Sequence, residues 1–446
     1  MKPIALILSF TFVLAALGEE NTSSLVSGDK LRSRLGLTSE YLAAAPLQNI
    51  RLAVFASAPR TFTPGQQDNA RYLPEGSSLW SGKREIEKNA LTDWDGRRLA
   101  QAVNGILSTA EQPPQIRIFV VASPSEFRES LEAASDWGAN VVLSTVLFPY
   151  FGNFDGTGPI DNLVEDFVDG GGAWVQSVGA YHHRVSERPF PAVDKPTFGS
   201  FVINADETPL LLTLTWKGFS PSGIRQGTDL DLNLKLYSMD PERVLIGESN
   251  WKQVTHDADS AKHETNIAAE QISVMLDAST KPYQFSVANG TKTGDTTGES
   301  YRLVFSSPKG WYSDQVKGTL VDPIQIEQPS PDSILIPADS RHAISVGSTL
   351  PADSRGVTDD KRTKPEVTVP NAEVIFSDRM GLAGSDAGAA EVAAVVAVLK
   401  AVSPGVRLHV IQKMLQERSP LISADREKGT LLPSLAEWRK IENSKK

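Results

Sequence analysis

The chain has few residues that could do covalent or metal chemistry, because it contains no cysteine and only six histidines. Thiolate nucleophiles, disulfides and cysteine-type zinc sites are therefore excluded. The histidines stand at 182, 183, 256, 263, 342 and 409, and none lies at a spacing from other histidines or acids that is typical of a metal site. Chemistry in this chain would depend on hydroxyl, carboxyl or imidazole groups that the fold brings together.

Two short segments carry residue types that could form a site. Ser385 and Asp386 stand at the start of an apolar helical pattern, in the run Gly-Ser-Asp-Ala-Gly-Ala-Ala. Asp229, Asp231 and Asn233 alternate along another segment, like the acidic residues of a carbohydrate or calcium site. The same alternation is typical of the solvated face of a strand whose leucines face the core. We expect the solvated face, and keep the binding interpretation as the alternative.

The elements that must position these residues alternate between strands and helices. Short apolar runs are separated by amphipathic segments of helical length, which is typical of a doubly wound, mostly parallel α/β sheet. Strands are predicted at 51–57, 116–122, 139–145, 173–178 and 343–347, and helices at 96–106, 125–137, 160–169, 386–401 and 406–417.

The alternation is interrupted by a long segment whose apolar residues have period two, as in Leu212-Thr-Leu-Thr-Trp216. Antiparallel strands with one buried face have this pattern. We therefore predict an α/β domain made of residues 50–197 and 316–418, with a jelly-roll-like antiparallel β-sandwich inserted at 198–315.

The two ends of the chain carry different signals. Lys2 is followed by an apolar run and then small residues, which predicts a secretory signal peptide at 1–18 and a secreted or periplasmic protein. The run is shorter than the roughly 20 residues of a spanning helix, so we expect no membrane span after its removal. Residues 19–49, weakly helical over 30–45, and the tail 419–446 show no chemistry.

The composition and the net charge of the chain indicate which classes of partner it could bind. Hydrophobic residues make up 40% of the chain, which is enough for an ordinary core, and the formal net charge is -10. No block of lysine and arginine concentrates positive charge, so we expect no nucleic-acid partner.

Four motifs in the second part of the chain resemble those of subtilisin-like serine peptidases, the subtilases. They are Ile336-Pro-Ala-Asp-Ser-Arg-His-Ala-Ile-Ser-Val-Gly347, Ser354-Arg-Gly356, Lys364-Pro-Glu-Val-Thr-Val-Pro370 and Gly384-Ser-Asp-Ala-Gly-Ala-Ala-Glu-Val-Ala-Ala394. Upstream, Asp155-Gly-Thr-Gly-Pro-Ile160 and Trp174-Val-Gln-Ser-Val-Gly-Ala180 are similar to a bacterial subgroup with a β-sandwich insertion. The resemblance covers residues 50 to 418 and implies a subtilisin-like fold.

The same resemblance implies that the catalytic positions are emptied. The family's aspartate, histidine and serine positions hold Ala56, Asp95 and Asp386, and the position of its oxyanion asparagine holds Ala180. Alanine cannot orient an imidazole, and a carboxylate with a pKa near 4 is almost no base towards a hydroxyl at pH 7. Losing one oxyanion donor alone costs about 10²–10³ in rate. A one-residue shift would instead make Ser385 the nucleophile.

Two interpretations account for the acids at these positions. Asp95 and Asp386 would each start a helix, where aspartate is a favourable N-cap. If they lie side by side as the family's histidine and serine do, they would instead form a pair that binds Ca²⁺ or Mg²⁺, or shares a proton. We expect caps and no cofactor, with the cation site as the alternative.

From these observations we expect an exported pseudopeptidase that binds a protein, an extended peptide or a glycan through the former substrate cleft or the sandwich. The alternative is a serine endopeptidase that hydrolyses peptide bonds, as the family resemblance implies. The sequence does not indicate an oligomeric state.

Overall fold

A computed structural model gives the fold of most of the chain. It describes residues 28–57, 78–86, 95–108, 110, 112–193, 195–219, 230–254, 258, 260–291, 299–307, 312–314, 319–370, 372–375, 381–424 and 430–443. The predicted signal peptide at 1–18 lies outside the described residues. No helix among those that are described is long and apolar enough to cross a membrane.

The core of the α/β part is an eight-stranded sheet in the order β23-β20-β6-β5-β1-β4-β2-β3. Neighbouring strands are parallel, except that β3 is antiparallel to β2. The predicted mostly parallel sheet is thus confirmed. Its strands are β1 (Arg51–Ser57), β2 (Ser78–Ser81), β3 (Arg84–Ile86), β4 (Gln115–Val121), β5 (Val141–Ser144), β6 (Ala173–Ser177), β20 (Ile344–Ser348) and β23 (Val367–Val369).

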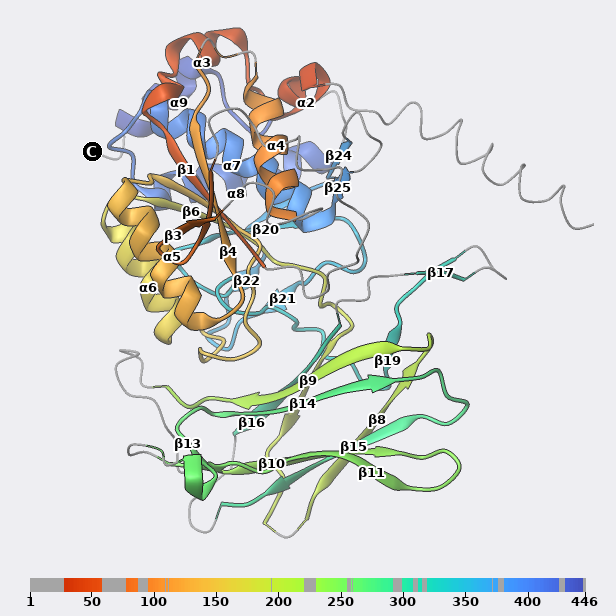
Figure 1. Ribbon diagram of the computed structural model, residues 1–446. Helices are drawn as coiled ribbons and strands as arrows, with labels where there is room; N and C mark the ends of the chain where they lie inside the picture. The colour runs from red at the N-terminus through yellow and green to blue at the C-terminus, as the bar shows by residue number, and fades with distance from the viewer. Residues whose placement is uncertain are drawn as a thin grey trace, which may run out of the picture.

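Helices cover both faces of this sheet (Figure 1). Strand β1 shows why, since Leu52, Val54 and Ala56 belong to one apolar cluster and Ala53 and Phe55 to another. The first cluster includes residues of α2 (Gly28–Leu35), α3 (Ser39–Ala44), α4 (Asp95–Leu107), α7 (Gly384–Val402), α8 (Leu408–Ala424) and α9 (Leu435–Asn443). The second includes residues of α5 (Pro124–Trp137) and α6 (Pro159–Asp169).

The segments at the two ends are more ordered than the sequence indicates. The weak helical pattern of 30–45 forms two helices, α2 and α3, which are separated at Gly36 with a φ of 76°. A Cβ at Gly36 would lie 2.9 Å from Thr430 of the C-terminal segment. In the predicted tail, α9 packs Trp438 into the core with no exposed surface. Both ends therefore complete the α/β part.

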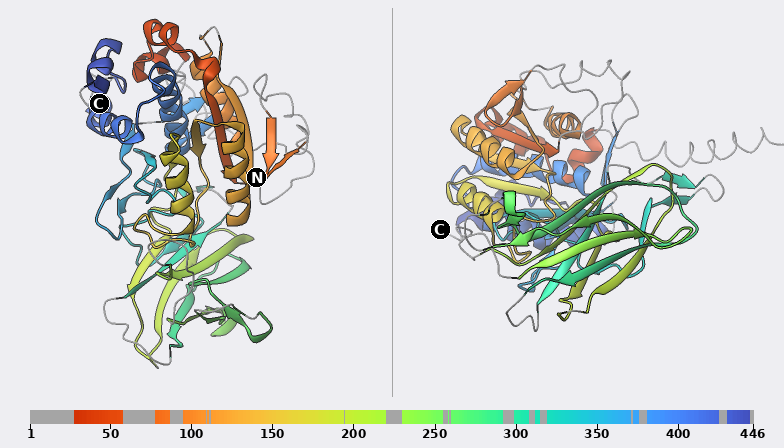
Figure 2. Two further views of the ribbon diagram at one scale, coloured as in Figure 1. Left: turned by 90° about the vertical axis from the view of Figure 1, so that its left-hand side faces the viewer. Right: turned by 60° about the horizontal axis from the view of Figure 1, so that its bottom comes forward.

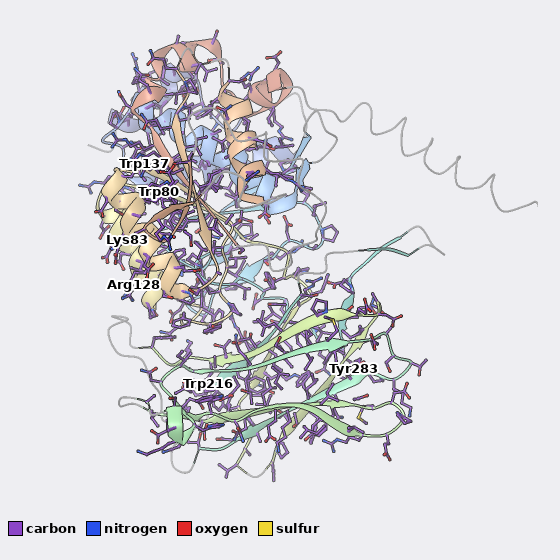
Figure 3. All side chains as sticks on the ribbon, in the orientation of Figure 1. Trp80, Lys83, Arg128, Trp137, Trp216 and Tyr283 are labelled. Atoms are coloured by element: carbon purple, nitrogen blue, oxygen red, sulfur yellow. The ribbon has the colours of Figure 1, made fainter. Side chains whose placement is uncertain are left out.

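The inserted segment forms two antiparallel sheets, in the orders β11-β10-β15-β8-β19 and β14-β9-β16-β7. Both contribute to one apolar core, in which Trp216 and Tyr283 lie (Figure 3). The strands are β7 (Val185–Pro189), β8 (Thr197–Ile203), β9 (Thr208–Trp216), β10 (Leu232–Ser238), β11 (Val244–Ser249), β14 (Ala269–Leu276), β15 (Tyr283–Asn289), β16 (Ser300–Ser306) and β19 (Ile324–Ile326).

These sheets begin before and end after the predicted range of 198–315. Strand β7 pairs with β16 and β19 pairs with β8, so the sheets extend from Val185 to Ile326. Both additional strands are edge strands and short, which gives them little periodicity to detect. Figures 1 and 2 show the insertion at one end of the α/β part.

The remaining short elements lie in loops. They are η1 (Leu47–Asn49), η3 (Ser260–Lys262), β12 (Lys252–Gln253), β13 (Glu264–Thr265), β17 (Tyr312–Asp314), β18 (Thr319–Val321), β21 (Gly356–Val357), β22 (Thr363–Lys364), β24 (Glu373–Ile375) and β25 (Gly381–Ala383).

The chain is tied together where it enters and leaves the insertion. Arg184 precedes the first strand of the insertion and Asp322 precedes its last strand. The guanidinium Nη2 and Nε donate to the two carboxylate oxygens of Asp322 at 2.8 and 3.0 Å, and both side chains are buried. A bidentate pair of this kind fixes the crossing point of the two chain segments.

Candidate functional site

The start of α7, at the carboxyl end of β6, is where the sequence places the former nucleophile. Gly384 begins the helix with a φ of 70°, a left-handed conformation that favours glycine. A Cβ there would lie 2.9 Å from Oδ1 of Asp353. The N-cap is Ala383, which makes no side-chain capping bond. The prediction that Asp386 is the N-cap is therefore wrong, because the helix begins at Gly384, two residues earlier.

Asp386 lies instead in the first turn of α7, half-buried, and faces the end of β6. Its Oδ1 accepts a hydrogen bond of 2.5 Å from the hydroxyl of Ser177. The Ser177 Oγ in turn accepts from the backbone N–H of Gly179 at 3.2 Å. The carboxylate is thus stabilised by a charge-assisted bond and by the positive end of the helix dipole.

Ser385 is buried, with 4% of its surface exposed. Its backbone N–H donates to the carboxylate of Asp353, which also accepts from the backbone N–H of Ser348 at 2.7 Å. Burial raises the pKa of Asp353, although these hydrogen bonds act in the opposite direction. Asp353 therefore ties the start of α7 to the loop after β20. No feature of this arrangement activates the Ser385 hydroxyl.

Ala180, at the predicted oxyanion position, lies exposed in the loop after β6. The loop is held on both sides of Ala180. Ser354 donates its backbone N–H to the carbonyl of Gly179 at 2.8 Å, and its Oγ accepts from the N–H of Tyr181 at 2.9 Å. The backbone is thus fixed without a side chain that could donate to an oxyanion.

The other two predicted positions lie on β1 and α4. Ala56 is fully buried in the apolar cluster that β1 shares with α4 and α7. Asp95 is the first residue of α4, but its side chain lies outside the described residues. Pairing of Asp95 with Asp386, and a cation held between them, therefore stay predictions. Elsewhere in the described part of the chain, no group of three or more acids or histidines could hold a metal ion.

Imidazole is the group best suited to act as a base towards a serine hydroxyl. The described histidines are 182, 183, 263, 342 and 409, and none of their rings is hydrogen-bonded to a serine hydroxyl. His182 has a buried Nδ1 without a partner, and burial lowers its pKa. His342 has its ring Nε2 3.4 Å from Glu165.

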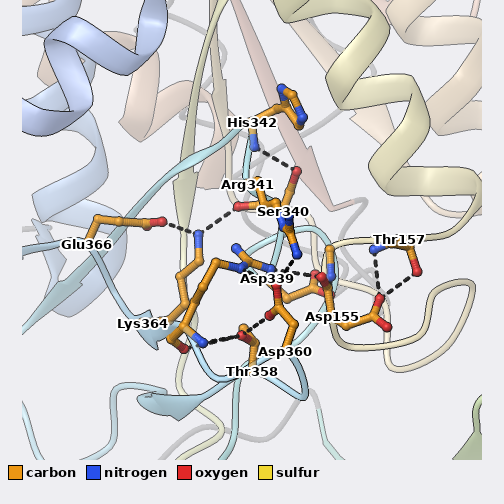
Figure 4. Close-up of polar contacts among 12 residues, drawn as sticks. Asp155, Thr157, Asp339, Ser340, Arg341, His342, Thr358, Asp360, Lys364 and Glu366 are labelled. Atoms are coloured by element: carbon orange, nitrogen blue, oxygen red, sulfur yellow. Dashed lines mark hydrogen bonds and ion pairs between the residues drawn. The ribbon is translucent and has the colours of Figure 1, made fainter. Parts of the chain in front are cut away.

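A second polar cluster, which sequence reasoning missed, lies in the segments 155–161, 339–342 and 358–366, most of which Figure 4 shows. Asp161 is in the first turn of α6 and is 1% exposed, yet neither of its carboxyl oxygens has a hydrogen-bond partner. Burial raises its pKa well above the ordinary value, and the nearby charge of Asp339 raises it further. Burial without a partner disfavours the charged form of this carboxyl.

Asp339 is the acid whose charge helps to raise the pKa of Asp161. It is fully buried, and its Oδ2 accepts from the backbone N–H of Gly156 at 3.0 Å, while its Oδ1 has no partner. Burial raises the pKa of Asp339 to about 6, against the opposing effects of that hydrogen bond and of Lys364. Asp161 and Asp339 therefore form a buried acid pair.

Cations hold the surroundings of the acid pair in place. Lys364 is fully buried, donates to the carbonyl of Ser340 at 2.7 Å and forms an ion pair with Glu366. Arg362 donates its Nη2 to the carbonyl of Asp155 at 2.9 Å and its Nε to Asp360 at 2.7 Å. The cluster joins three chain segments.

The predicted solvated face of the insertion is only partly as expected. Leu232 and Leu234 are buried in the core, as the alternation predicts. Asp231, however, is half-buried, and burial raises its pKa while its Oδ1 lacks a partner. Asp231 and Asn233 both have intermediate exposure, as expected for the outward face, although Oδ1 of Asp231 is shielded from water. Asp229 lies outside the described residues.

Comparison with known proteins supports the fold. No family model matches the sequence, and no curated protein is similar to it. The structure of the Clostridium perfringens CspB protease superimposes with a TM-score of 0.52, covering 91% of this chain and 97% of that one at 13% identity.

Two looser matches are a mutant of the protease domain of PatA and MycP1 with its N-terminal propeptide removed. PatA has a TM-score of 0.37 at 9% identity, covering 90% of this chain and 97% of that one. MycP1 has a TM-score of 0.35 at 12% identity, covering 87% and 89%. The match to the CspB protease, together with the sheet and its antiparallel insertion, shows that this chain has a subtilisin-like fold.

Proposed function

We propose that this protein is an exported, non-catalytic binding protein built on a peptidase fold. The observation that carries the proposal is the engaged carboxylate of Asp386, which accepts the Ser177 hydroxyl where a nucleophile would have to be free. Ser-type hydrolysis needs a hydroxyl beside a base that takes its proton. A buried alanine at position 56 and a buried Ser385 tied to Asp353 provide neither.

A reactivity experiment tests the non-catalytic part of the proposal. The full chain is incubated with a fluorophosphonate probe and, separately, with fluorescent casein. We expect neither labelling nor cleavage above a Ser385→Ala control. Covalent labelling of Ser385, lost in the Ser385→Ala variant, would establish the serine endopeptidase alternative.

A cavity of about 310 Å³, lined by the insertion and by the loop after β5, favours a glycan among the expected ligands. Trp251, which is 37% exposed and stacks on His263, lines it with Tyr150 and with the polar side chains of Glu264 and Gln271. Beneath them Glu270 is buried, and its carboxylate accepts bonds from Ser249 and from Gln253 at 2.9 Å. An aromatic face beside fixed polar groups is suited to a sugar ring, whose faces are apolar and whose edges carry hydroxyls.

Calorimetric titration with maltotriose and chitotriose tests the ligand class. We expect saturable binding of one of these sugars, weakened about tenfold in Trp251→Ala, since a central aromatic contact dominates such sites. Met275→Ala is the matched control, because Met275 is an exposed apolar residue of the same insertion and is not in the cavity lining. A different result would identify an extended peptide as the ligand. In that case neither sugar binds, whereas casein that has been unfolded by carboxymethylation does bind.

A further inference from the structure

A second cavity, of about 550 Å³, lies at the opposite edge of the sheet from Asp386. The turn between α6 and β6, the segment before β20 and the turn between α7 and α8 surround it. These are the amino ends of β6 and β20, whereas Asp386 faces the carboxyl end of β6. The cavity is therefore separate from the former catalytic centre.

Lys400 brings a buried positive charge to this cavity. It is 5% exposed, and its Nζ donates to the carbonyls of Gly171, Val406 and Pro404 at 2.9, 3.1 and 3.4 Å. All three acceptors are neutral, and burial alone lowers the pKa of Lys400, with no carboxylate acting against it. The ammonium is hydrogen-bonded, but its charge is not balanced.

Two more basic side chains line the cavity without a partner. Arg407 and His409 are exposed, and neither side chain forms a hydrogen bond or an ion pair in the described part of the chain. Two other basic groups of the lining are already paired, since Arg341 donates to Asp360 and His342 lies beside Glu165. Lys400 and Arg407 therefore supply unbalanced positive charge, and His409 adds an imidazole that can form a hydrogen bond.

Only limited negative charge opposes this surplus. Asp169 is the one acidic residue of the cavity lining, and it is absent from the charges that shift the pKa of Lys400. The backbone adds positive potential, because α8 begins at Leu408, and the first N–H groups of a helix have no partner within it. The cavity is therefore basic although the whole chain has a net charge of -10. A local positive potential of this kind favours binding of an anion.

We propose that this cavity binds a small molecule through a phosphate group. Basic side chains from the α7–α8 turn and the start of a helix converge on one space, an arrangement suited to a doubly charged tetrahedral oxyanion. The volume exceeds that of inorganic phosphate, so an organic group is accommodated beside it. The site is independent of the sugar-binding cavity on the insertion.

Calorimetric titration of the full chain with inorganic phosphate at low ionic strength tests the proposal. We expect one saturable site, with affinity reduced about tenfold in Arg407→Ser, since one charge-assisted bond is lost. We expect Arg407→Ser combined with His409→Ser to bind more weakly still. Acetate, a planar anion of single charge, is expected to bind far more weakly than phosphate.

Arg439→Ser is the matched control, because Arg439 is an exposed, unpaired arginine of α9 outside the cavity lining. Melting temperatures without phosphate establish that each variant is folded. Lys400 is left unchanged because its three carbonyl contacts hold the α7–α8 turn. The proposal fails if phosphate gives no saturable binding, if acetate binds equally well, or if Arg407→Ser and Arg439→Ser weaken binding to the same extent.

Discussion

Asp161 and Asp386 occupy the same position in two helices of one fold, and the protein treats them differently. Each is the third residue of its helix, after an N-cap, Gly158 or Ala383, that makes no side-chain capping bond. Asp386 is half-buried and accepts the Ser177 hydroxyl, whereas Asp161 is buried without a partner beside Asp339. The helix dipole alone is too weak to keep a buried carboxylate charged.

The largest expected effect comes from removing Lys364, the cation with the largest influence on the pKa values of the buried acid pair. Lys364 is fully buried, pairs with Glu366 and lowers the pKa of both Asp161 and Asp339. We expect Lys364→Met to reduce the free energy of unfolding by about 3–5 kcal/mol, because Glu366 is left buried and unpaired. Urea unfolding at pH 7 measures it.

Lys413→Met is the matched control for that change. Lys413 lies 3.8 Å from Glu417 on α8, and both side chains are more than half exposed. An exposed pair of this kind contributes about 0–1 kcal/mol. Equal losses in the two variants would mean that burial of the Lys364 pair has no energetic weight.

The acid pair also predicts how the wild-type protein responds to pH. Asp339 has a folded-state pKa of about 6, above its ordinary 3.8, so the folded state binds more protons than the unfolded state between these values. Proton binding by Asp339 therefore contributes to the free energy of unfolding. This contribution is fully present below pH 4 and is lost as pH rises through 6, and the total loss is on the order of 3 kcal/mol. The pKa of Asp161 is raised in the same direction, which extends the loss to higher pH.

Urea unfolding between pH 4 and 8 measures this loss. Other groups add their own pH dependence, so the comparison is between the wild type and an Asp339→Asn variant at each pH. A wild-type stability that rises relative to Asp339→Asn over this range would contradict the raised pKa.

Replacing Asp161 by asparagine removes the ionisable group while it keeps the shape of the side chain. We expect Asp161→Asn to stabilise the protein by about 2 kcal/mol at pH 8, where the wild type must either bury an ionised carboxyl or bind a proton to keep it neutral, and to change little at pH 4. Thermal unfolding at both values measures the difference. Asp166→Asn, an exposed position of the same helix, should change stability by less than about 0.5 kcal/mol at either pH.

An element of the fold could be predicted from the sequence where its determinants lie close together in the chain, and not where they come from distant segments. Strand β1 was predicted with its observed bounds, because Arg-Leu-Ala-Val-Phe-Ala-Ser is a compact apolar run. The break of the N-terminal helix at Gly36 was not, because the close approach of Thr430 is made by a segment almost 400 residues away. Edge strand β7 was missed because its charged residues hide a short pattern.

The same distinction holds for the sites. The motif predicts helix α7, but the helix begins at Gly384 rather than at 386, so the N-cap assignment of Asp386 is wrong. Its partner Ser177 lies 209 residues away, so no local pattern indicates the bond. Asp161 resembles any acid in the first turn of a helix. Its burial depends on packing that brings Gly152 and Asp339 close to its carboxyl group.

The smallest effect is expected at Asp386, where the carboxylate has both a partner and access to water. Asp386→Ala should cost about 1 kcal/mol, from the lost Ser177 bond and the lost charge at the helix start. Ser177→Ala should cost a similar amount, since each side chain is the hydrogen-bond partner of the other. Because they form one interaction, the double variant should cost less than the sum, with a coupling of about 0.5–1.5 kcal/mol.

The coupling distinguishes the two acids more sharply than either single variant does. Removing the hydroxyl that holds the Asp386 carboxylate should lower the stability of the protein. Removing the ionisable group of Asp161, which is buried without a partner, should instead raise it. Strict additivity of Asp386→Ala and Ser177→Ala in urea unfolding would mean that the 2.5 Å bond stabilises nothing. Asp386 would then be held by the helix dipole alone, and the difference from Asp161 would reduce to exposure to water.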